Sequence, residues 1–181
     1  MHLDWQPSTD LPGEPILTSV TANESAELRK LAAAQRVLEI GSAHGYSSVV
    51  MALAGAEHIL AVDDHSGTTW LGDTLGVMQA NLRKYQVADK VSIRQGNSMT
   101  VLPDLRAEEA RFGFIFIDGD HRLDGAMADI ENALALLEPG GTIAVHDFLE
   151  HCCCPDVMFA VNRLIAAGPD YVVDTLAVIR P

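Results

Sequence analysis

The sequence predicts an α/β domain with a doubly wound, mostly parallel, Rossmann-like sheet of about seven strands, the last one antiparallel, and helices on both faces. Two observations support this prediction. Short apolar segments without clear polar alternation recur along the 181 residues, as expected of parallel strands that are buried on both faces. Amphipathic segments with a helical period separate them. A chain of this length can bury a substantial core within one domain.

The predicted elements alternate along the chain after an irregular N-terminal arm over residues 1–20. A helix over 21–34 has Thr21 or Asn23 as its expected cap. The segment 138–141, Glu-Pro-Gly-Gly, is expected to end the helix before it. The last segment, 171–180, is either two strands that turn at Asp174 and Thr175 or one bent strand. The other strands are expected at 36–40, 58–63, 90–96, 112–118 and 142–147, and the other helices at 46–54, 75–85, 99–105 (a short turn), 123–137 and 155–167. Residues 21–181 therefore form the domain.

Charge and composition disfavour several classes of partner. The 12 Lys and Arg against 25 Asp and Glu give a formal net charge of −13. Nucleic acids and anionic membranes reward clustered basic residues, so a small molecule is the expected partner. No apolar run approaches the roughly 20 residues of a membrane span, and the N-terminus lacks the basic-then-apolar order of a signal peptide. We therefore expect a cytoplasmic protein.

Polar, ionisable or glycine residues follow nearly every predicted strand. Ligands of open α/β sheets bind beyond the carboxyl ends of the strands. One shared cleft is therefore indicated by the strand ends of this kind, which lie at 39–41, 62–64, 95–98, 117–121 and 145–147.

The segment VLEIGSAHGYSS has the order strand, glycine turn, helix. Gly41 permits a tight turn, and Gly45 lets the helix begin close to the strand. A dinucleotide fingerprint would need glycine at Ala43, so a nicotinamide-dependent oxidoreductase is disfavoured. Glu39 suits a cation better than a pyrophosphate, and Asp63 ends the next strand, where a carboxylate can accept hydrogen bonds from ribose hydroxyls. An adenosine that carries a positive group fits these features, whereas a plain turn and a solvated or capping acid are the structural alternatives.

These segments resemble the class I S-adenosylmethionine-dependent methyltransferases. VLEIGSAHGYSS is similar to their first motif, AVDD to the acidic end of their second strand, and RQGNS to the segment beside the adenine. FIFIDGDH, LEPGGTIAVHDF and WLGD resemble a branch of small O-methyltransferase-like domains related to the catechol-type enzymes. The resemblance runs from Glu24 to Arg180 and implies S-adenosyl-L-methionine as cofactor and a small-molecule hydroxyl, on a sugar or an aromatic compound, as methyl acceptor. The cofactor-binding residues that we expect are Glu39, Gly41, Ser42, Gly45, Tyr46, Ser47, Asp63, Asp64, Asn97, Ser98 and Asp118.

The same resemblance implies a reactive end of the cleft. In catechol-type relatives the acids that end the fourth and fifth strands hold a magnesium-like ion, and those positions are Asp118 and Asp147 here. A base lies three residues after the first acid; here it is His121, whose ordinary pKa of about 6.5 suits a general base. The position of the third ligand holds Phe148, so His146 is either a substitute ligand, which would favour softer metals over magnesium, or a packed, hydrogen-bonded histidine.

Several interpretations stay open at this point. Asp118, Asp147 and His121 also fit a cofactor contact or helix cap, a structural acid and a surface residue, respectively. The functional alternatives are a metal-independent methyltransferase that acts on another acceptor and a non-catalytic, cofactor-binding regulatory subunit. The short arm offers little material for a lid, so the acceptor pocket is either open or completed by a partner subunit, which would make the protein a homodimer.

Two further groups of residues have an uncertain role in the sequence. Cys152, Cys153 and Cys154 are consecutive, which suits neither a disulfide framework nor the paired spacing of a structural zinc site. With His151 they are interpreted as the start of the last helix, with a soft-metal or redox site as the alternative. Trp70 and Leu71 either cap the cleft or pack as ordinary apolar side chains.

Overall fold

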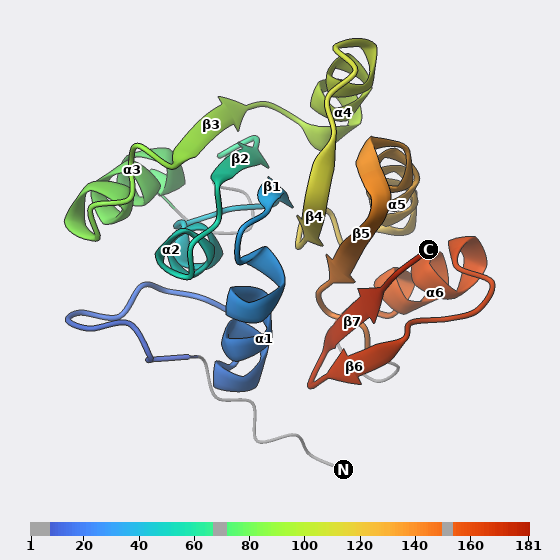
Figure 1. Ribbon diagram of the computed structural model, residues 1–181, viewed down its shortest axis with the longest axis horizontal. Helices are drawn as coiled ribbons and strands as arrows, with labels where there is room; N and C mark the ends of the chain where they lie inside the picture. Colours follow the sequence, from blue (N-terminus) through green and yellow to red (C-terminus); the bar gives the residue numbers. More distant parts are fainter. Residues whose placement is uncertain (1–7, 67–71, 150–153) are drawn as a thin grey trace.

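The sheet has the predicted architecture in a computed structural model that describes residues 8–66, 72–149 and 154–181. Within these residues, seven strands are arranged in the order β3-β2-β1-β4-β5-β7-β6 (Figure 1). They are β1 (Arg36–Ile40), β2 (His58–Asp63), β3 (Val91–Gln95), β4 (Phe112–Ile117), β5 (Leu137–Val145), β6 (Tyr171–Val173) and β7 (Leu176–Ile179). The first five pair in parallel, whereas β7 runs antiparallel between β5 and β6. The doubly wound, mostly parallel sheet is therefore confirmed.

Helices cover both faces of this sheet (Figure 1). One apolar cluster joins Phe114 and Phe116 of β4 to the first three helices, and a second joins Ile115 and Ile117 of the same strand to the last three. All six residues of β4 are buried, which explains why this strand reads as an unbroken apolar run. The helices are α1 (Ala22–Ala32), α2 (Tyr46–Leu53), α3 (Thr74–Lys84), α4 (Ser98–Ala107), α5 (Leu123–Leu136) and α6 (Pro155–Leu164).

The strand order reverses between β1 and β4, and this reversal positions the site. The chain leaves β1 toward α2 on one face and leaves β4 toward α5 on the other. Neighbouring strands whose connections diverge in this way open a crevice at their carboxyl ends, where ligands of such sheets bind. Gly41 follows one of these strands and Asp118 follows the other.

Three local expectations are settled by the structure. Thr21, not Asn23, caps α1: its side chain accepts from the Glu24 N–H, and Glu24 accepts from the Thr21 N–H in return. The C-terminal segment is two strands that turn at Asp174, whose φ of 52° is in the left-handed region. The short turn expected near Pro103 is a helix of 10 residues, because Val101, Leu102 and Leu105 are buried against the second cluster.

The segment 138–141 does not end α5 as a loop. Leu137 adopts extended backbone directly after the helix and pairs with Phe112, so the segment lies inside β5. A register shift between Phe112 and Phe114 accommodates it. The helix therefore ends before this segment, as predicted, but it passes straight into a strand.

Residues 8–20 contain neither helix nor strand, yet they pack against the domain. Leu11, Ile16 and Val20 are buried in the cluster on the face of α1 to α3. Within the described residues, no helix combines the length and apolar character needed to cross a membrane. Trp70, Leu71, His151, Cys152 and Cys153 lie outside the described residues.

Candidate active site

The turn after β1 is built against the end of β4. Gly41 has a φ of 85°, and a Cβ atom added there would lie 2.0 Å from the carbonyl oxygen of Asp118. Only glycine combines this backbone conformation with so close an approach. The turn that was expected to hold the cofactor and the acid that was expected at the reactive end are therefore in direct contact.

Asp63 organises this turn from the neighbouring strand. Its Oδ2 accepts hydrogen bonds from the backbone N–H groups of Ser42 and Ala43, both 2.8 Å long, and its Oδ1 accepts one of 2.7 Å from His65 N–H. A carboxylate has about four acceptor positions, so Asp63 keeps room for a further donor. The Ser42 hydroxyl is buried and has no hydrogen-bond partner in the described part of the chain. A polar group that is left unpaired in this way fits a ligand-binding turn.

Glu39 lies beneath the turn and is completely buried. Its carboxyl group accepts hydrogen bonds from the hydroxyls of Ser47 and Ser48, in the first turn of α2. Burial raises the pKa of Glu39 to about 7; the two hydroxyls oppose this shift, and the charges of Asp118 and Asp63 add to it. This acid therefore lacks a positive partner within the described chain.

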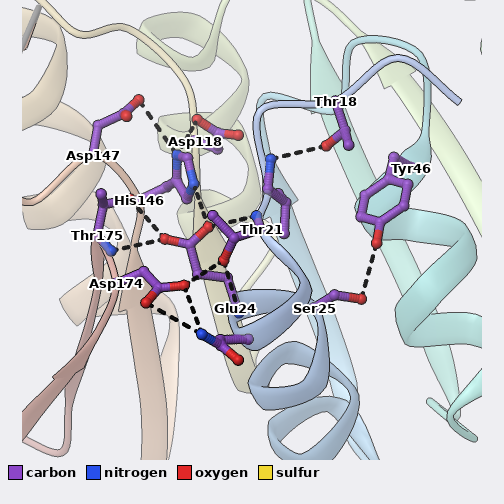
Figure 2. A network of polar contacts seen from close by, with 12 residues as sticks. Thr18, Thr21, Glu24, Ser25, Tyr46, Asp118, His146, Asp147, Asp174 and Thr175 are labelled. Atoms are coloured by element: carbon purple, nitrogen blue, oxygen red, sulfur yellow. Dashed lines mark hydrogen bonds and ion pairs between the residues drawn. The ribbon is translucent and has the colours of Figure 1, made fainter. Parts of the chain in front are cut away.

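Four titratable side chains gather at the ends of β4 and β5. His121 Nε2 lies 3.0 Å from Asp147 Oδ2 and 3.5 Å from Asp118 Oδ1. His146 Nδ1 lies 3.4 Å from the same Asp118 oxygen and 3.3 Å from Asp147 Oδ2. Figure 2 shows the His146 ring between these two acids and Glu24 of α1. Asp147 adopts a φ of 60°, a left-handed conformation that is uncommon outside glycine and is often found at functional sites.

The two histidines compensate the two acids electrostatically. Hydrogen bonding to Asp118 and Asp147 raises the pKa of His121 to about 10, although partial burial opposes the shift. Burial would lower the pKa of His146, but the charge of Asp118 and contacts with Asp147 and Glu24 raise it well above its usual value. Burial would conversely raise the pKa values of both aspartates, and the histidines lower them.

The donors of this cluster fit a divalent cation. One oxygen of Asp118, one of Asp147 and a ring nitrogen of His146 all lie within 4.8 Å of one another. His146 Nδ1 is buried and makes no hydrogen bond within the described residues, so it would be available to a cation once its proton is lost. Two carboxylates with one imidazole suit first-row divalent metals as well as magnesium. Phe148 contributes no such donor: its side chain packs against the second apolar cluster.

His121, Asp147 and Cys154 form a second set of donors within the same distance of one another. This set shares Asp147 with the first, so the two are parts of one cluster. Cys154 is buried beside the start of α6, in the position that the sequence predicted for the last of the three cysteines.

Some of the expected cofactor residues have other partners. The Tyr46 hydroxyl donates to Asp10 of the N-terminal arm and lies 2.9 Å from the Ser25 hydroxyl (Figure 2), away from the cluster. Asp64 accepts from Ser66 N–H. Asn97 caps α4 by accepting from Met99 N–H, and Ser98 is the first residue of that helix. Gly45, with a φ of 80°, precedes α2, where a Cβ atom would meet Met78 at 2.7 Å.

Glu24 and Thr175 were not among the site residues expected from the sequence. Glu24 is completely buried and lies 3.2 Å from His146 Nε2 through its Oε2, while its Oε1 accepts from the backbone N–H and the hydroxyl of Thr175. The spacing Thr21-x-x-Glu24 is the signature of a capping box and could have drawn attention to this residue. Its contact with His146, 122 positions away, has no local signal.

Comparison with known proteins agrees with this geometry. A family model described as a methyltransferase domain matches residues 38–148. Caffeoyl-CoA O-methyltransferase 1 of Zea mays is 35% identical over 141 residues, which cover 74% of this chain and 52% of that protein. Tricin synthase 1 of Oryza sativa subsp. japonica is 33% identical over 130 residues, or 67% of this chain and 48% of that protein. The chain thus spans about half the length of these curated relatives.

A solved structure with the same fold supports the comparison. The O-methyltransferase from Bacillus cereus in complex with SAH superposes with a TM-score of 0.70 over 90% of this chain and 82% of that chain, at 22% identity. Identity at this level compares folds only, and the fold agrees with the strand order described above. Together with the family match, it identifies the chain as a member of the class I S-adenosylmethionine-dependent methyltransferases, in their O-methyltransferase-like branch.

Proposed function

We propose that this protein transfers the methyl group of S-adenosyl-L-methionine to a hydroxyl oxygen of a small molecule, a sugar or an aromatic compound. The observation that carries the proposal is the contact between the Gly41 turn and Asp118, since a methyl group held at the turn would then meet an acceptor held at the acid–histidine cluster. The acceptor oxygen attacks the methyl carbon, the carbon–sulfur bond breaks, and S-adenosylhomocysteine leaves. Alignment of this kind can supply roughly 7–11 kcal/mol in favourable cases.

The roles of the cofactor residues follow from this arrangement. Glu39, Gly41, Ser42 and Gly45 would surround the methionine part of the cofactor, and Glu39, which lacks a positive partner among the described residues, suits its sulfonium charge. Asp63 would bind the ribose hydroxyls with its remaining acceptor capacity. At the adenine, Asn97 and Ser98 would form the border.

Asp118, Asp147 and His146 would hold a divalent cation, which when bound supplies a Lewis acid that lowers the pKa of the acceptor hydroxyl. His121 lies beside both acids, which keep its imidazole protonated while their charges are uncompensated. A cation bound to these acids would offset their charges, and the neutral His121 would then take the proton that the hydroxyl loses. A base in such a position contributes typically about 10²–10⁴ in rate.

One observation favours a metal-independent variant of the same reaction. Both acids already lie within 3.5 Å of histidine nitrogens, so the cluster is compensated without a cation. In this variant the histidines would orient the acceptor, which need not be a hydroxyl.

The test is a transfer assay with methyl-labelled S-adenosyl-L-methionine and a panel of catechols and glycosides, with chelator and then with Mg²⁺ or Mn²⁺. We expect labelled product, with a rate that falls about 10²–10⁴-fold in His121→Asn. Loss of transfer in chelator, restored by cation, would support the metal-assisted form. Cofactor binding without transfer to any acceptor would contradict the proposal and favour a regulatory subunit.

The proposal retains the environment that the sequence predicted: the cytoplasm, with no nucleic-acid or membrane partner. It also retains the two alternatives for the acceptor pocket, which is either open or completed by a partner subunit in a homodimer. The net charge of −13 supports the absence of anionic partners. Analytical ultracentrifugation tests the homodimer.

A further inference from the structure

Glu24 lies on α1, outside the sheet, yet its side chain reaches the end of β5. Its Oε2 accepts a hydrogen bond of 2.8 Å from Thr21 N–H and lies 3.2 Å from His146 Nε2. Its Oε1 accepts hydrogen bonds of 2.8 and 2.7 Å from the backbone N–H and the hydroxyl of Thr175. Figure 2 shows these contacts converging on one carboxylate. Four donors from three separate segments therefore surround it.

Capping α1 does not require this arrangement. A capping box needs only the reciprocal bonds between Thr21 and Glu24, and it works at the surface, where a carboxylate stays hydrated. Here the carboxylate is completely buried, which is costly unless it is paired and hydrogen-bonded. The contacts to His146 and Thr175 supply that pairing, and they connect α1 to β5 and to the turn between β6 and β7.

The pairing determines how His146 presents its ring. An ionised carboxylate can only accept hydrogen bonds, so His146 Nε2 must carry a proton toward Glu24. The opposite nitrogen, Nδ1, then points at Asp118 and Asp147, at 3.4 and 3.3 Å. Phe116 packs edge-on against the ring, with centroids 6.4 Å apart and planes at 79°. Orientation and proton position of a histidine are commonly fixed by a carboxylate in this way.

We propose that Glu24 is a positioning residue: through His146 it fixes the geometry of the Asp118–His146–Asp147 donor set, and Thr175 holds Glu24 in place. The inference rests on the proposed function in so far as it takes this donor set as the place where a cation and the acceptor bind. Glu24 itself touches neither, and its effect passes entirely through the imidazole.

The chain offers a matched control on the same helix. Glu27 also connects α1 to the C-terminal hairpin, by accepting a hydrogen bond of 2.5 Å from the Tyr171 hydroxyl. The polar partners of Glu27 within the described residues are Lys30 and Tyr171, and His146 is not among them. Glu27→Gln therefore weakens the same attachment of α1 and leaves the imidazole alone.

The test compares Glu24→Gln, Glu27→Gln and wild type by two readouts that need no acceptor: Mn²⁺ titration, and ¹⁵N NMR of the His146 ring from about pH 6 to pH 9. The amide of Glu24→Gln keeps one acceptor oxygen for four donors. We expect Mn²⁺ affinity to fall about 10–100-fold and Nε2 to lose its fixed proton, while binding of S-adenosylhomocysteine is unchanged. Glu27→Gln should match wild type in both readouts.

The proposal is overturned if Glu24→Gln only lowers the melting temperature, as Glu27→Gln would, and keeps both the Mn²⁺ affinity and the Nε2 proton of wild type. If wild type binds no Mn²⁺, the metal-assisted function fails, and the NMR comparison still decides the role of Glu24. If Glu24→Gln does not fold, Thr175→Val replaces it, since it keeps the carboxylate and removes one donor. A drop in Mn²⁺ affinity or a disturbed Nε2 proton is then expected, and wild-type behaviour would refute the inference.

Discussion

Two glutamates at opposite ends of the site, Glu24 and Glu39, are equally shielded from solvent, yet their pKa values move in opposite directions. Burial raises the pKa of Glu39 to about 7, because the hydrogen bonds from two serine hydroxyls oppose it only in part and the charges of two nearby acids add to it. At Glu24 burial acts in the same direction, but the imidazolium of His146 and the donors of two threonines outweigh it and lower the pKa to about 2. Burial alone therefore does not decide whether a carboxyl group is ionised; its donors do.

The two glutamates lie in regions that differ in whether the protein itself supplies a partner for each buried polar or charged group. Around Glu24 each negative group has a positive or hydrogen-bonding partner from the protein itself. Beneath the Gly41 turn, Glu39 has no cationic partner in the described chain, and the Ser42 hydroxyl is left unpaired there. A cationic ligand such as a sulfonium would supply the missing partner in the second region, whereas the protein itself supplies the partners in the first.

The largest effect on stability should come from removing the buried carboxylate of Glu24. Glu24→Ala removes the acceptor of four donors and leaves His146 Nε2 buried without its carboxylate partner. We expect the free energy of unfolding to fall by about 3–5 kcal/mol, the range for breaking a buried pair from one side. Denaturant titration measures this, with Glu27→Ala as the control. A loss no greater than that of the control would mean that the pairing adds little to stability.

Gly41→Ala tests the place where the two regions touch. The new methyl group would meet the Asp118 carbonyl in a backbone conformation with φ of 85°, so we expect about 2–4 kcal/mol of destabilisation from overpacking and strain together. Binding of S-adenosylhomocysteine should be lost as well. Gly55→Ala separates the two causes, since Gly55 has a φ of 97° but nothing within 4 Å; it should lose about 1 kcal/mol and bind normally. Equal losses in the two variants would show that the contact with Asp118 is unimportant.

Glu39→Gln should stabilise the protein, but only at higher pH. The pKa of Glu39 in the folded protein, about 7, lies above the ordinary glutamate pKa of 4.5. The contribution of Glu39 to the free energy of unfolding is therefore fully present below about pH 4.5 and is lost as the pH rises through about 7. We expect Glu39→Gln to match wild type in stability near pH 5. Near pH 8 its free energy of unfolding should exceed that of wild type by about 2–3 kcal/mol, because a pKa difference of one corresponds to about 1.4 kcal/mol. Thermal melts of the cofactor-free protein at the two pH values measure this. A gain of the same size at both would contradict the raised pKa.

Much of the fold could be predicted because its strands carry their own signals. The segments 36–40 and 58–63 are apolar runs bounded by polar residues, and they became β1 and β2 with the same limits. The start of β5 could not be predicted, because the Gly-Gly pair at 140–141 usually marks a stop and only pairing with β4 reveals a strand. The turn predicted over 99–105 likewise covered only part of α4, whose full length depends on burial of apolar side chains that a local window does not show.

The site residues that directly follow strands could be predicted, whereas those that reach the site only through packing could not. Asp118, His121, His146 and Asp147 come at strand ends, and parallel strands bring such ends together; the structure does so. Glu24 lies more than 120 positions from the residue it orients. Its contribution arises only when α1 packs beside β5 and the last turn, which no spacing in the sequence encodes.

The most direct test of the proposed methyl transfer is calorimetric titration of the purified protein with S-adenosylhomocysteine and, separately, with NADH, each with and without Mn²⁺. We expect S-adenosylhomocysteine to bind and NADH not to bind, and we expect Mn²⁺ binding to be lost in Asp118→Ala and Asp147→Ala. Binding of S-adenosylhomocysteine with no response to Mn²⁺ would keep the cofactor site and remove the metal. Absence of S-adenosylhomocysteine binding under every condition would contradict the assignment of the Gly41 turn, and with it the proposed methyl transfer.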